Sequence, residues 1–432
     1  MNTLIVNALM YIITAFFLKK KFGMSPLVFL WFYYATFAIF GVLAVYYEIY
    51  YEDFPTCRNQ QLSLEPYIYN YICMVLLSFP LASLKGEKLN FHSIKLHPKF
   101  NLYAKTIFLI FSVLFLCKVI ELSLYGNMSY YERHTMIIND GESYSLSSIS
   151  PILDSIARTC TRIYQILYPF VVFFILYFLQ KNKLGIQKLI VWGVISIAPM
   201  LTGYIISGNR AGLFYLLINL TFFFFIIKQY LSKKTLYRIY FLAFIIAVIL
   251  FSISMDISEE RFQHTEMGTI GKIQRYFGEV FPNLGYQYWE HVKNYTLGAR
   301  KFITYYSLFD DANSLNLQGF DETFSYWSFI TGVDTALFKT VFGDLYIEFG
   351  TVGAICFSVV LSLILFMLTR KYPPSIYNIP IYYYYYAFCT NLIFDIGTMY
   401  TSLNFVYLLI GMILVTIYLN KTHLFKYKTD KI

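Results

Sequence analysis

The chain has 432 residues, of which 58% are hydrophobic and only 14% are charged. Soluble domains carry about 25% charged residues, so this composition excludes an ordinary soluble protein and indicates an integral membrane protein. The net charge of +9 is spread over short segments between apolar runs, which argues against nucleic-acid binding and for a role in orienting the chain in a bilayer. The six cysteines show no metal-binding spacing, so we expect no metal site and no disulfide framework.

Long apolar runs become helices in a bilayer, because the lipid offers no hydrogen-bond partner to the backbone. The first run lacks a basic start and a small-residue cleavage site, so we expect it to be a span and not a signal peptide. The sequence predicts an all-α polytopic membrane protein of about 11 transmembrane helices (10–12), in a single integral membrane domain over residues 1–432. The spans are expected near 2–18, 26–48, 67–84, 104–124, 160–180, 188–207, 211–228, 239–254, 340–369, 378–396 and 400–419.

Basic residues orient these spans. When alternate loops are assigned to opposite sides, one side receives most of the 34 basic residues, including Lys19–Lys21, in mostly short loops. The positive-inside rule makes that side cytoplasmic, which places the N-terminus outside and the C-terminus in the cytoplasm. The outer side then carries one large loop at 255–338, in which we expect short helices.

The two kinds of cation are sorted by side, since lysines concentrate on the cytoplasmic side and arginines on the outer side. The guanidinium fork binds phosphate through two hydrogen bonds and tolerates partial burial better than an ammonium does. An outer surface rich in arginine is therefore what a pyrophosphate site requires, although each single arginine is more often paired with a nearby acid. The arginines that we select as pyrophosphate ligands are Arg133, Arg158, Arg162, Arg210, Arg275 and Arg300.

Arg210 is the strongest of these residues, because it lies between two apolar runs with almost no loop to carry it away from the membrane. An arginine at membrane depth costs at least about 2.5–3.5 kcal/mol, so it needs a partner or a function. Arg158 and Arg162 share one helical face, but Asp154 precedes Arg158 by four residues and an ordinary i,i+4 ion pair is equally plausible there.

Two motifs carry a resemblance to a known family. Residues 207–212 read SGNRAG, and residues 342–353, at the start of a late span, read FGDLYIEFGTVG. With the large outer loop, these motifs resemble the O-antigen polymerases of bacterial inner membranes, also called oligosaccharide repeat-unit polymerases. The related O-antigen ligases use a histidine in the large loop, and here neither His264 nor His291 lies in a convincing ligase motif.

The resemblance implies a C-type membrane glycosyltransferase that works without a metal or another cofactor. Its members transfer a glycan from undecaprenyl pyrophosphate onto the next lipid-linked repeat unit, which extends an O-antigen, capsule or exopolysaccharide. Outer-face arginines hold the pyrophosphate in that family, and Arg210 occupies the matching turn. The partners implied are lipid-linked oligosaccharides, membrane lipid, a chain-length regulator and a flippase.

The reaction needs cations for the leaving pyrophosphate and a base for the acceptor hydroxyl. With Arg210, we take Glu132, His264 and Asp334 as catalytic candidates, although a lone loop carboxylate is usually just solvated. Glu348 is ionisable at membrane depth, and such groups are functional or partnered. The loop aromatics Tyr288, Trp289 and Trp327 are candidates for stacking on sugars, with an interfacial anchoring belt as the alternative.

Two other functions stay open. An O-antigen ligase would attach the glycan to lipid A-core, and a flippase or transporter would move the lipid-linked oligosaccharide. A transporter is expected to show internal repeats and charges in many spans, whereas here the ionisable residues gather towards one face. We therefore expect an enzyme at the outer face.

Overall fold

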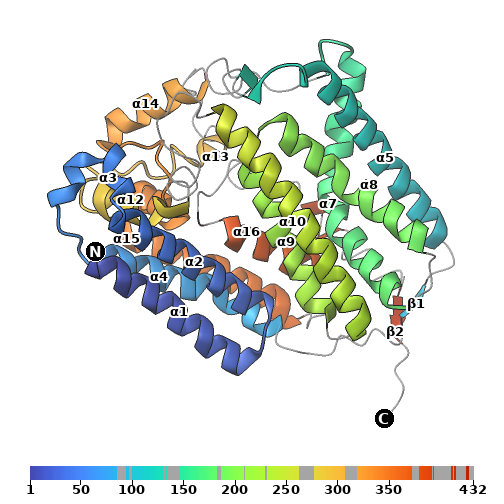
Figure 1. Ribbon diagram of the computed structural model, residues 1–432, viewed down its shortest axis with the longest axis horizontal. Coiled ribbons are helices and arrows are strands. Elements are labelled where there is room, and N and C mark those ends of the chain that lie inside the picture. The colour runs from blue at the N-terminus through green and yellow to red at the C-terminus, as the bar shows by residue number, and fades with distance from the viewer. Residues whose placement is uncertain are drawn as a thin grey trace. The chain divides into compact units, whose positions relative to one another are not determined.

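The computed structural model describes residues 1–84, 94–96, 100–130, 132–133, 146–181, 186–208, 210–228, 231–261, 277–306, 319–371, 379–391, 393, 410–411, 413–414 and 425–427. These residues form helices and one short antiparallel ladder, in which β1 (Ile94–Leu96) pairs with β2 (Phe425–Tyr427) (Figure 1). The chain divides into two compact units. Unit 1 holds Met1–Gly86, Phe262–Tyr372 and Tyr385–Phe405, and unit 2 holds Glu87–Arg261, Pro373–Tyr384 and Val406–Ile432.

Unit 1 begins with a hairpin of two apolar helices, α1 (Asn2–Phe22) and α2 (Pro26–Tyr46). Gly23 ends α1 with a φ of 65°, and the Ser25 hydroxyl accepts a hydrogen bond from the Val28 amide to begin α2. The other helices with residues in unit 1 are α3 (Ile49–Asp53), η1 (Pro55–Asn59), α4 (Glu65–Ser78), η2 (Phe79–Leu84), α12 (Val280–Asn283), η5 (Leu284–Tyr288), α13 (Ile303–Tyr306), α14 (Gly319–Thr331), α15 (Val341–Lys371) and the second half of α16 (Ile379–Asn391).

Unit 2 is built on longer helices, which are α5 (Phe100–Tyr125), α7 (Pro151–Lys181), α8 (Ile186–Ile206), α9 (Arg210–Ile227) and α10 (Lys233–Arg261). Helix α5 packs against α7 and α8, and α9 packs against α8 and α10. Helix α8 passes into α9 through a tight turn in which Gly208 has a φ of 58°, a conformation that glycine adopts without steric cost. Helix α8 ends at Ile206 and α9 begins at Arg210, so the connection is as short as the predicted spans near 188–207 and 211–228 require.

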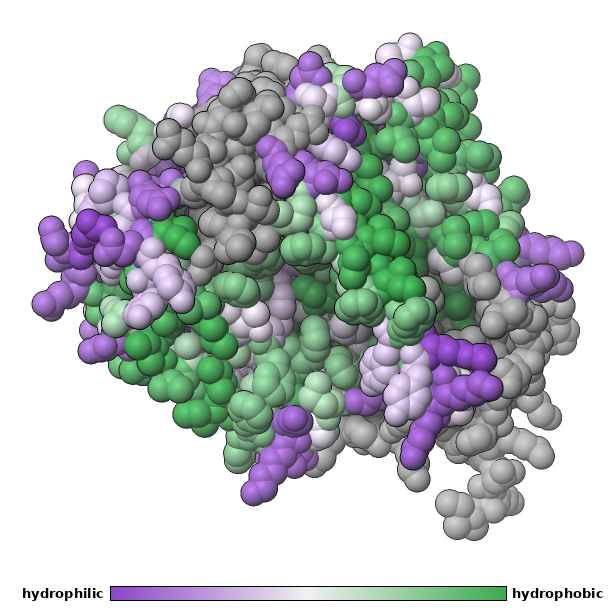
Figure 2. All heavy atoms as spheres, in the orientation of Figure 1, coloured by the Kyte–Doolittle hydropathy of each residue, from purple (hydrophilic) through white to green (hydrophobic). Residues whose placement is uncertain are grey.

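Among the described residues, six helices are long and apolar enough to cross a membrane, and two further apolar helices are shorter. Helix α1 exposes Ile13 and Phe17, and α10 exposes Phe241 and Phe244, each by more than half. Figure 2 shows hydrophobic side chains on the exposed surface of these helices. Large exposed apolar faces are stable only against lipid or a partner. The chain is thus a multi-pass α-helical membrane protein.

Of the about 11 predicted spans, six are represented among the described residues by helices long and apolar enough to cross a membrane, and where a helix covers a predicted span the two differ at their ends. Helix α7 begins at Pro151 rather than near 160, and α10 runs from Lys233 to Arg261 rather than over 239–254. The reason is that hydropathy marks the part of a helix that meets lipid, whereas polar turns such as those around Asp256 continue the helix beyond it. The predicted outer loop accordingly starts after Arg261 and contains α12, α13 and α14. The predicted span at 400–419 lies almost entirely outside the described residues.

Candidate functional site

Helix α15 is interrupted at Gly350, whose backbone (φ 67°, ψ −173°) is not helical. Such a break leaves carbonyl groups at the end of the first half in need of donors. The carbonyl of Ile347 accepts from the Thr296 amide at 3.2 Å, and that of Glu348 accepts from the Leu297 amide at 2.8 Å. Segment 296–300 is thereby held against the first half of α15.

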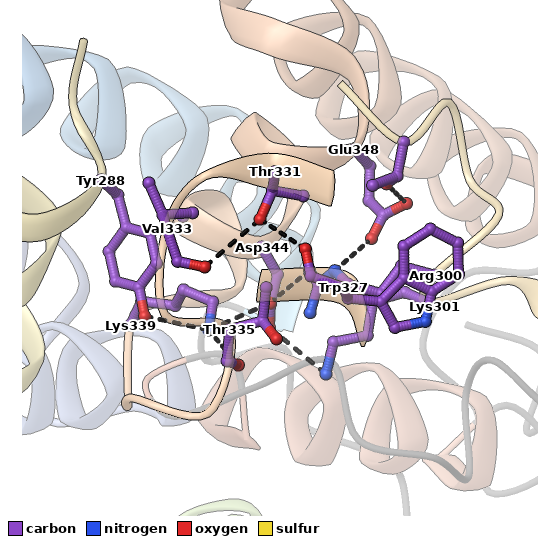
Figure 3. Close-up of polar contacts among 12 residues, drawn as sticks. Tyr288, Arg300, Lys301, Trp327, Thr331, Val333, Thr335, Lys339, Asp344 and Glu348 are labelled. Atoms are coloured by element: carbon purple, nitrogen blue, oxygen red, sulfur yellow. Dashed lines mark hydrogen bonds and ion pairs between the residues drawn. The ribbon is translucent and has the colours of Figure 1, made fainter. Parts of the chain in front are cut away.

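This segment brings Arg300 between two carboxylates of α15. Asp344 and Glu348 are four residues apart and share one helical face. Arg300 Nη2 lies 2.7 Å from Asp344 Oδ1, and Arg300 Nε lies 2.9 Å from Glu348 Oε1 (Figure 3). Glu348 Oε2 also accepts from the Thr296 hydroxyl and from the Gly298 amide. The side chains of Arg300, Asp344 and Glu348 are 4%, 2% and 0% exposed, so the cluster is buried.

Two lysines complete the cluster. Lys301 Nζ lies 3.6 Å from Asp344 Oδ2, and Lys339 Nζ lies 3.6 Å from Asp344 Oδ1. Lys339 is anchored by the carbonyls of Thr335 and Leu337, each at 2.9 Å, whereas the Lys301 side chain is 18% exposed. We call Arg300, Lys301, Lys339, Asp344 and Glu348 the charged cluster. Among the residues that the structure describes, these three cations face two carboxylates, a formal charge of +1, and Lys301 is the partly accessible cation.

Tyr288 supports the cluster from one side. Its hydroxyl donates to the Asp334 carbonyl and accepts from Lys339 Nζ at 3.3 Å, and its ring lies 4.7 Å from that ammonium. Burial, followed by the negative charges of Asp334 and Asp344, raises the pKa of Tyr288 well above its usual value, so the phenol stays protonated. Tyr288 is fully buried, and a sugar could not stack on its ring in this conformation.

The other two predicted stacking residues differ from each other. Trp327 is 6% exposed within α14 and is likewise closed to a sugar. Trp289 is only partly buried and lies parallel to Tyr346, with ring centroids 4.8 Å apart. Asp334, a candidate base, is exposed and accepts from the Ala336 amide at 2.9 Å, which is a local turn contact.

In unit 2, Arg133 holds the end of α8. Its Nη1 donates to the carbonyls of Ile205 at 3.4 Å and Ile206 at 3.2 Å, and its guanidinium lies 4.3 Å from the Tyr130 ring centroid. The Tyr130 ring in turn packs 3.6 Å from the position that a Cβ on Gly208 would occupy. Arg133, which is 5% exposed, therefore fixes the turn that leads into Arg210.

Among the remaining predicted residues of unit 2, those whose side chains the structure describes make local contacts or are exposed. Arg158 forms an ion pair with Asp154, the structural alternative that the sequence left open, and the Arg162 side chain is exposed. Glu132 and Ser129 exchange hydrogen bonds in a capping box, and the Ser129 amide lowers the pKa of Glu132. Arg210 is the first residue of α9, but its side chain is not described. His264 and Arg275 lie outside the described residues.

The predicted ligands thus fall into two units: Arg133, Arg158, Arg162 and Arg210 in unit 2, and Arg300 in unit 1. Sequence reasoning missed Lys301 and Lys339 because it treated arginine as the phosphate-binding cation. The lysine distribution could have identified them, because lysines are rare in the segments assigned to the outer side, and Lys301 and Lys339 are two of the few that lie there.

Comparisons with protein-family models, with curated proteins and with solved structures found no match for this chain. The function is therefore argued from the charged cluster and from the sequence motifs.

Proposed function

We propose that this protein is a glycan polymerase of the outer face of the bacterial inner membrane, with its N-terminus outside and its C-terminus in the cytoplasm. It joins oligosaccharide repeat units carried on undecaprenyl pyrophosphate into a surface polysaccharide, as a glycosyltransferase that needs no metal. The observation that carries the proposal is the charged cluster at the start of α15. Its two carboxylates, Asp344 and Glu348, lie in one of the two motifs that resemble the repeat-unit polymerases, and its three cations come from the segments before that motif.

The cluster has the properties that a pyrophosphate leaving group requires. Positive charges that are held in place before the reaction stabilise developing negative charge without reorganisation, and they act more strongly where water is excluded. Arg300 is fixed by two carboxylates and Lys339 by two carbonyls, so both cations keep their positions. Lys301 is the partly accessible cation that can meet a phosphate oxygen.

In the proposed reaction, the acceptor hydroxyl oxygen attacks the anomeric carbon of the donor. The bond between that carbon and the pyrophosphate oxygen breaks, its electron pair leaves with the pyrophosphate, and the hydroxyl proton passes to water or to a candidate base. Asp344 and Glu348 are committed to cations, so neither is suited to be the base. The motif at 207–212 makes Arg210 a separate candidate for pyrophosphate binding within unit 2, and Arg133 positions that turn.

The test is polymerisation by purified protein of a synthetic undecaprenyl-pyrophosphate-linked repeat unit, with the products sized on a gel. Lys301→Ala and Arg210→Ala should each reduce the ladder at least about tenfold, the effect of removing one charge-assisted contact. Arg58→Ala is the matched control, because Arg58 lies in a segment assigned to the outer side, pairs with the exposed Glu48 and lies over the Tyr51 ring, away from the charged cluster.

The absence of a ladder from folded wild-type protein with the correct repeat unit would overturn the proposal. Transfer to lipid A-core without a ladder would then identify a ligase, and movement of the lipid across vesicles without transfer would identify a flippase. A ladder that Lys301→Ala leaves unchanged would remove the charged cluster from the reaction.

A further inference from the structure

A group of four aromatic side chains adjoins the charged cluster in unit 1. Tyr346 and Trp289 are stacked, with centroids 4.8 Å apart and an interplanar angle of 19°. Tyr69 backs Trp289 at 5.4 Å, and Tyr295 meets Tyr346 edge-on at 5.9 Å and 83°. We call Tyr69, Trp289, Tyr295 and Tyr346 the aromatic surface. Its rings hold one another in place, as offset and T-shaped pairs do.

Tyr295 is the open ring of this surface. It is 48% exposed, whereas Tyr346 is 6% and Tyr69 is 4% exposed. Tyr295 lies over the break in α15, because a Cβ on Gly350 would be 3.3 Å from the ring. A half-exposed, well-supported aromatic ring offers a flat apolar face without a large loss of conformational entropy on binding.

The aromatic surface and the charged cluster are continuous along two segments. On the outer loop, Tyr295 precedes Thr296, whose hydroxyl donates to Glu348, and Arg300 follows in the same turn. On α15, Tyr346 projects from the side opposite to Asp344 and Glu348, but the Tyr295 ring lies against Gly350, two residues after Glu348. A ligand whose phosphates meet Lys301 beside Asp344, and which extends along the first half of α15, would therefore reach Tyr295 at Gly350.

Polar groups contact two of the rings, and further polar residues follow Trp289 in the sequence; the Glu290 amide donates to the Tyr346 hydroxyl at 3.4 Å. The Glu65 carboxylate accepts from Trp289 Nε1 at 3.4 Å, and Glu290, His291 and Asn294 are exposed. Carboxylates, amides and imidazoles are the groups that bond sugar hydroxyls, while the CH face of a pyranose is apolar. An aromatic ring within a polar rim fits a sugar better than it fits an acyl chain, which has no hydroxyl groups to satisfy.

We infer that the aromatic surface binds the sugars next to the pyrophosphate of a polyprenyl-linked oligosaccharide, with a pyranose face on Tyr295. This inference rests on the proposed function, because it takes the charged cluster as the pyrophosphate site. It replaces Tyr288 and Trp327 by Tyr295 as the ring that meets the glycan, and it gives Gly350 a second role, which is to leave room for that ring.

The test compares binding of two lipids to purified protein in detergent micelles: undecaprenyl pyrophosphate alone and undecaprenyl pyrophosphate carrying its oligosaccharide. Tyr295→Ala should weaken binding of the glycan-bearing lipid about 2- to 12-fold, the range for loss of one aromatic pair, and leave the glycan-free lipid unchanged. Tyr295→Phe keeps the ring and should bind both lipids as wild type does. Tyr47→Ala removes an exposed tyrosine directly after α2, 61% exposed against 48% for Tyr295, and should leave binding of both lipids unchanged.

Equal binding of the glycan-bearing lipid by Tyr295→Ala and wild type, or equal weakening of both lipids, would overturn the sugar assignment while leaving the proposed function intact. Wild-type protein that binds neither lipid, or a Lys301→Ala variant that binds both as wild type does, would overturn the proposed function and the sugar assignment with it.

Discussion

Replacing Arg300 by alanine tests whether the charged cluster is as tightly coupled as its geometry indicates. The change leaves Asp344 and Glu348, both almost fully buried, without the guanidinium that lies 2.7 Å and 2.9 Å away. Removing one partner of a buried ion pair costs about 3–5 kcal/mol, because the other charge stays desolvated. Asp344 keeps Lys301 and Lys339 at 3.6 Å, so we expect a loss near the lower end, about 3 kcal/mol in the free energy of unfolding.

The measurement is unfolding of Arg300→Ala and wild type in mixed micelles by titration with a denaturing detergent. Arg58→Ala is the control, since the Arg58 and Glu48 side chains are 57% and 64% exposed and surface pairs contribute at most about 1 kcal/mol. The double variant Arg300→Ala/Glu348→Gln should be less destabilised than the sum of the single variants, because Glu348→Gln removes the carboxylate that Arg300 compensates.

An Arg300→Ala variant within about 1 kcal/mol of wild type would refute this reasoning, as that is the range of a solvated pair. Strict additivity in the double variant would do the same, because it would show that Arg300 and Glu348 do not interact.

Three further predictions concern stability. Gly350→Ala should lower the free energy of unfolding by about 1–2 kcal/mol in thermal unfolding, because a φ of 67° strains an L-residue and the new Cβ would meet Tyr295 at 3.3 Å. An unchanged free energy of unfolding would mean that α15 is not broken at Gly350. Asn70→Ala should cost about 1–3 kcal/mol, since Asn70 joins the Tyr11 hydroxyl at 2.6 Å to the Thr340 hydroxyl at 2.6 Å, and Asn70→Asp should not restore the loss. Hydrogen bonds from Ser129 lower the pKa of Glu132, so its carboxylate stabilises the fold above the unfolded-state pKa of about 4.3. This stabilisation is lost as the pH falls through the pKa of Glu132 in the folded protein. The melting temperatures of wild type and Glu132→Gln should therefore converge below about pH 4.

Helix positions followed from hydropathy because a long apolar run has one stable form in lipid. The turn between α8 and α9 could also be predicted, since Gly208 supplies the left-handed backbone and the polar run around it interrupts the apolar sequence. The ends of α7 and α10 could not, because their outermost turns carry polar residues that hydropathy assigns to loops.

The candidate site was predictable only residue by residue. Arg300 was selected as an outer cation and Glu348 as an ionisable group in need of a partner, but nothing in the sequence pairs two residues so far apart. Their meeting depends on the loop at Leu297, which has an unusual φ of 51° for a leucine, and on the carbonyls at the end of the first half of α15. Such backbone geometry leaves no compositional signal.

The break at Gly350 also bears on how α15 enters a bilayer. Residues 351–371 form a helix about 30 Å long at 1.5 Å per residue, which equals the thickness of a hydrocarbon core. The second half can therefore be inserted as a complete span, while the first half stays with the outer loop. In the proposed topology, Asp344 and Glu348 then stay outside the lipid interior, and Gly350 separates the half of α15 that can span the bilayer from the half that packs around Arg300.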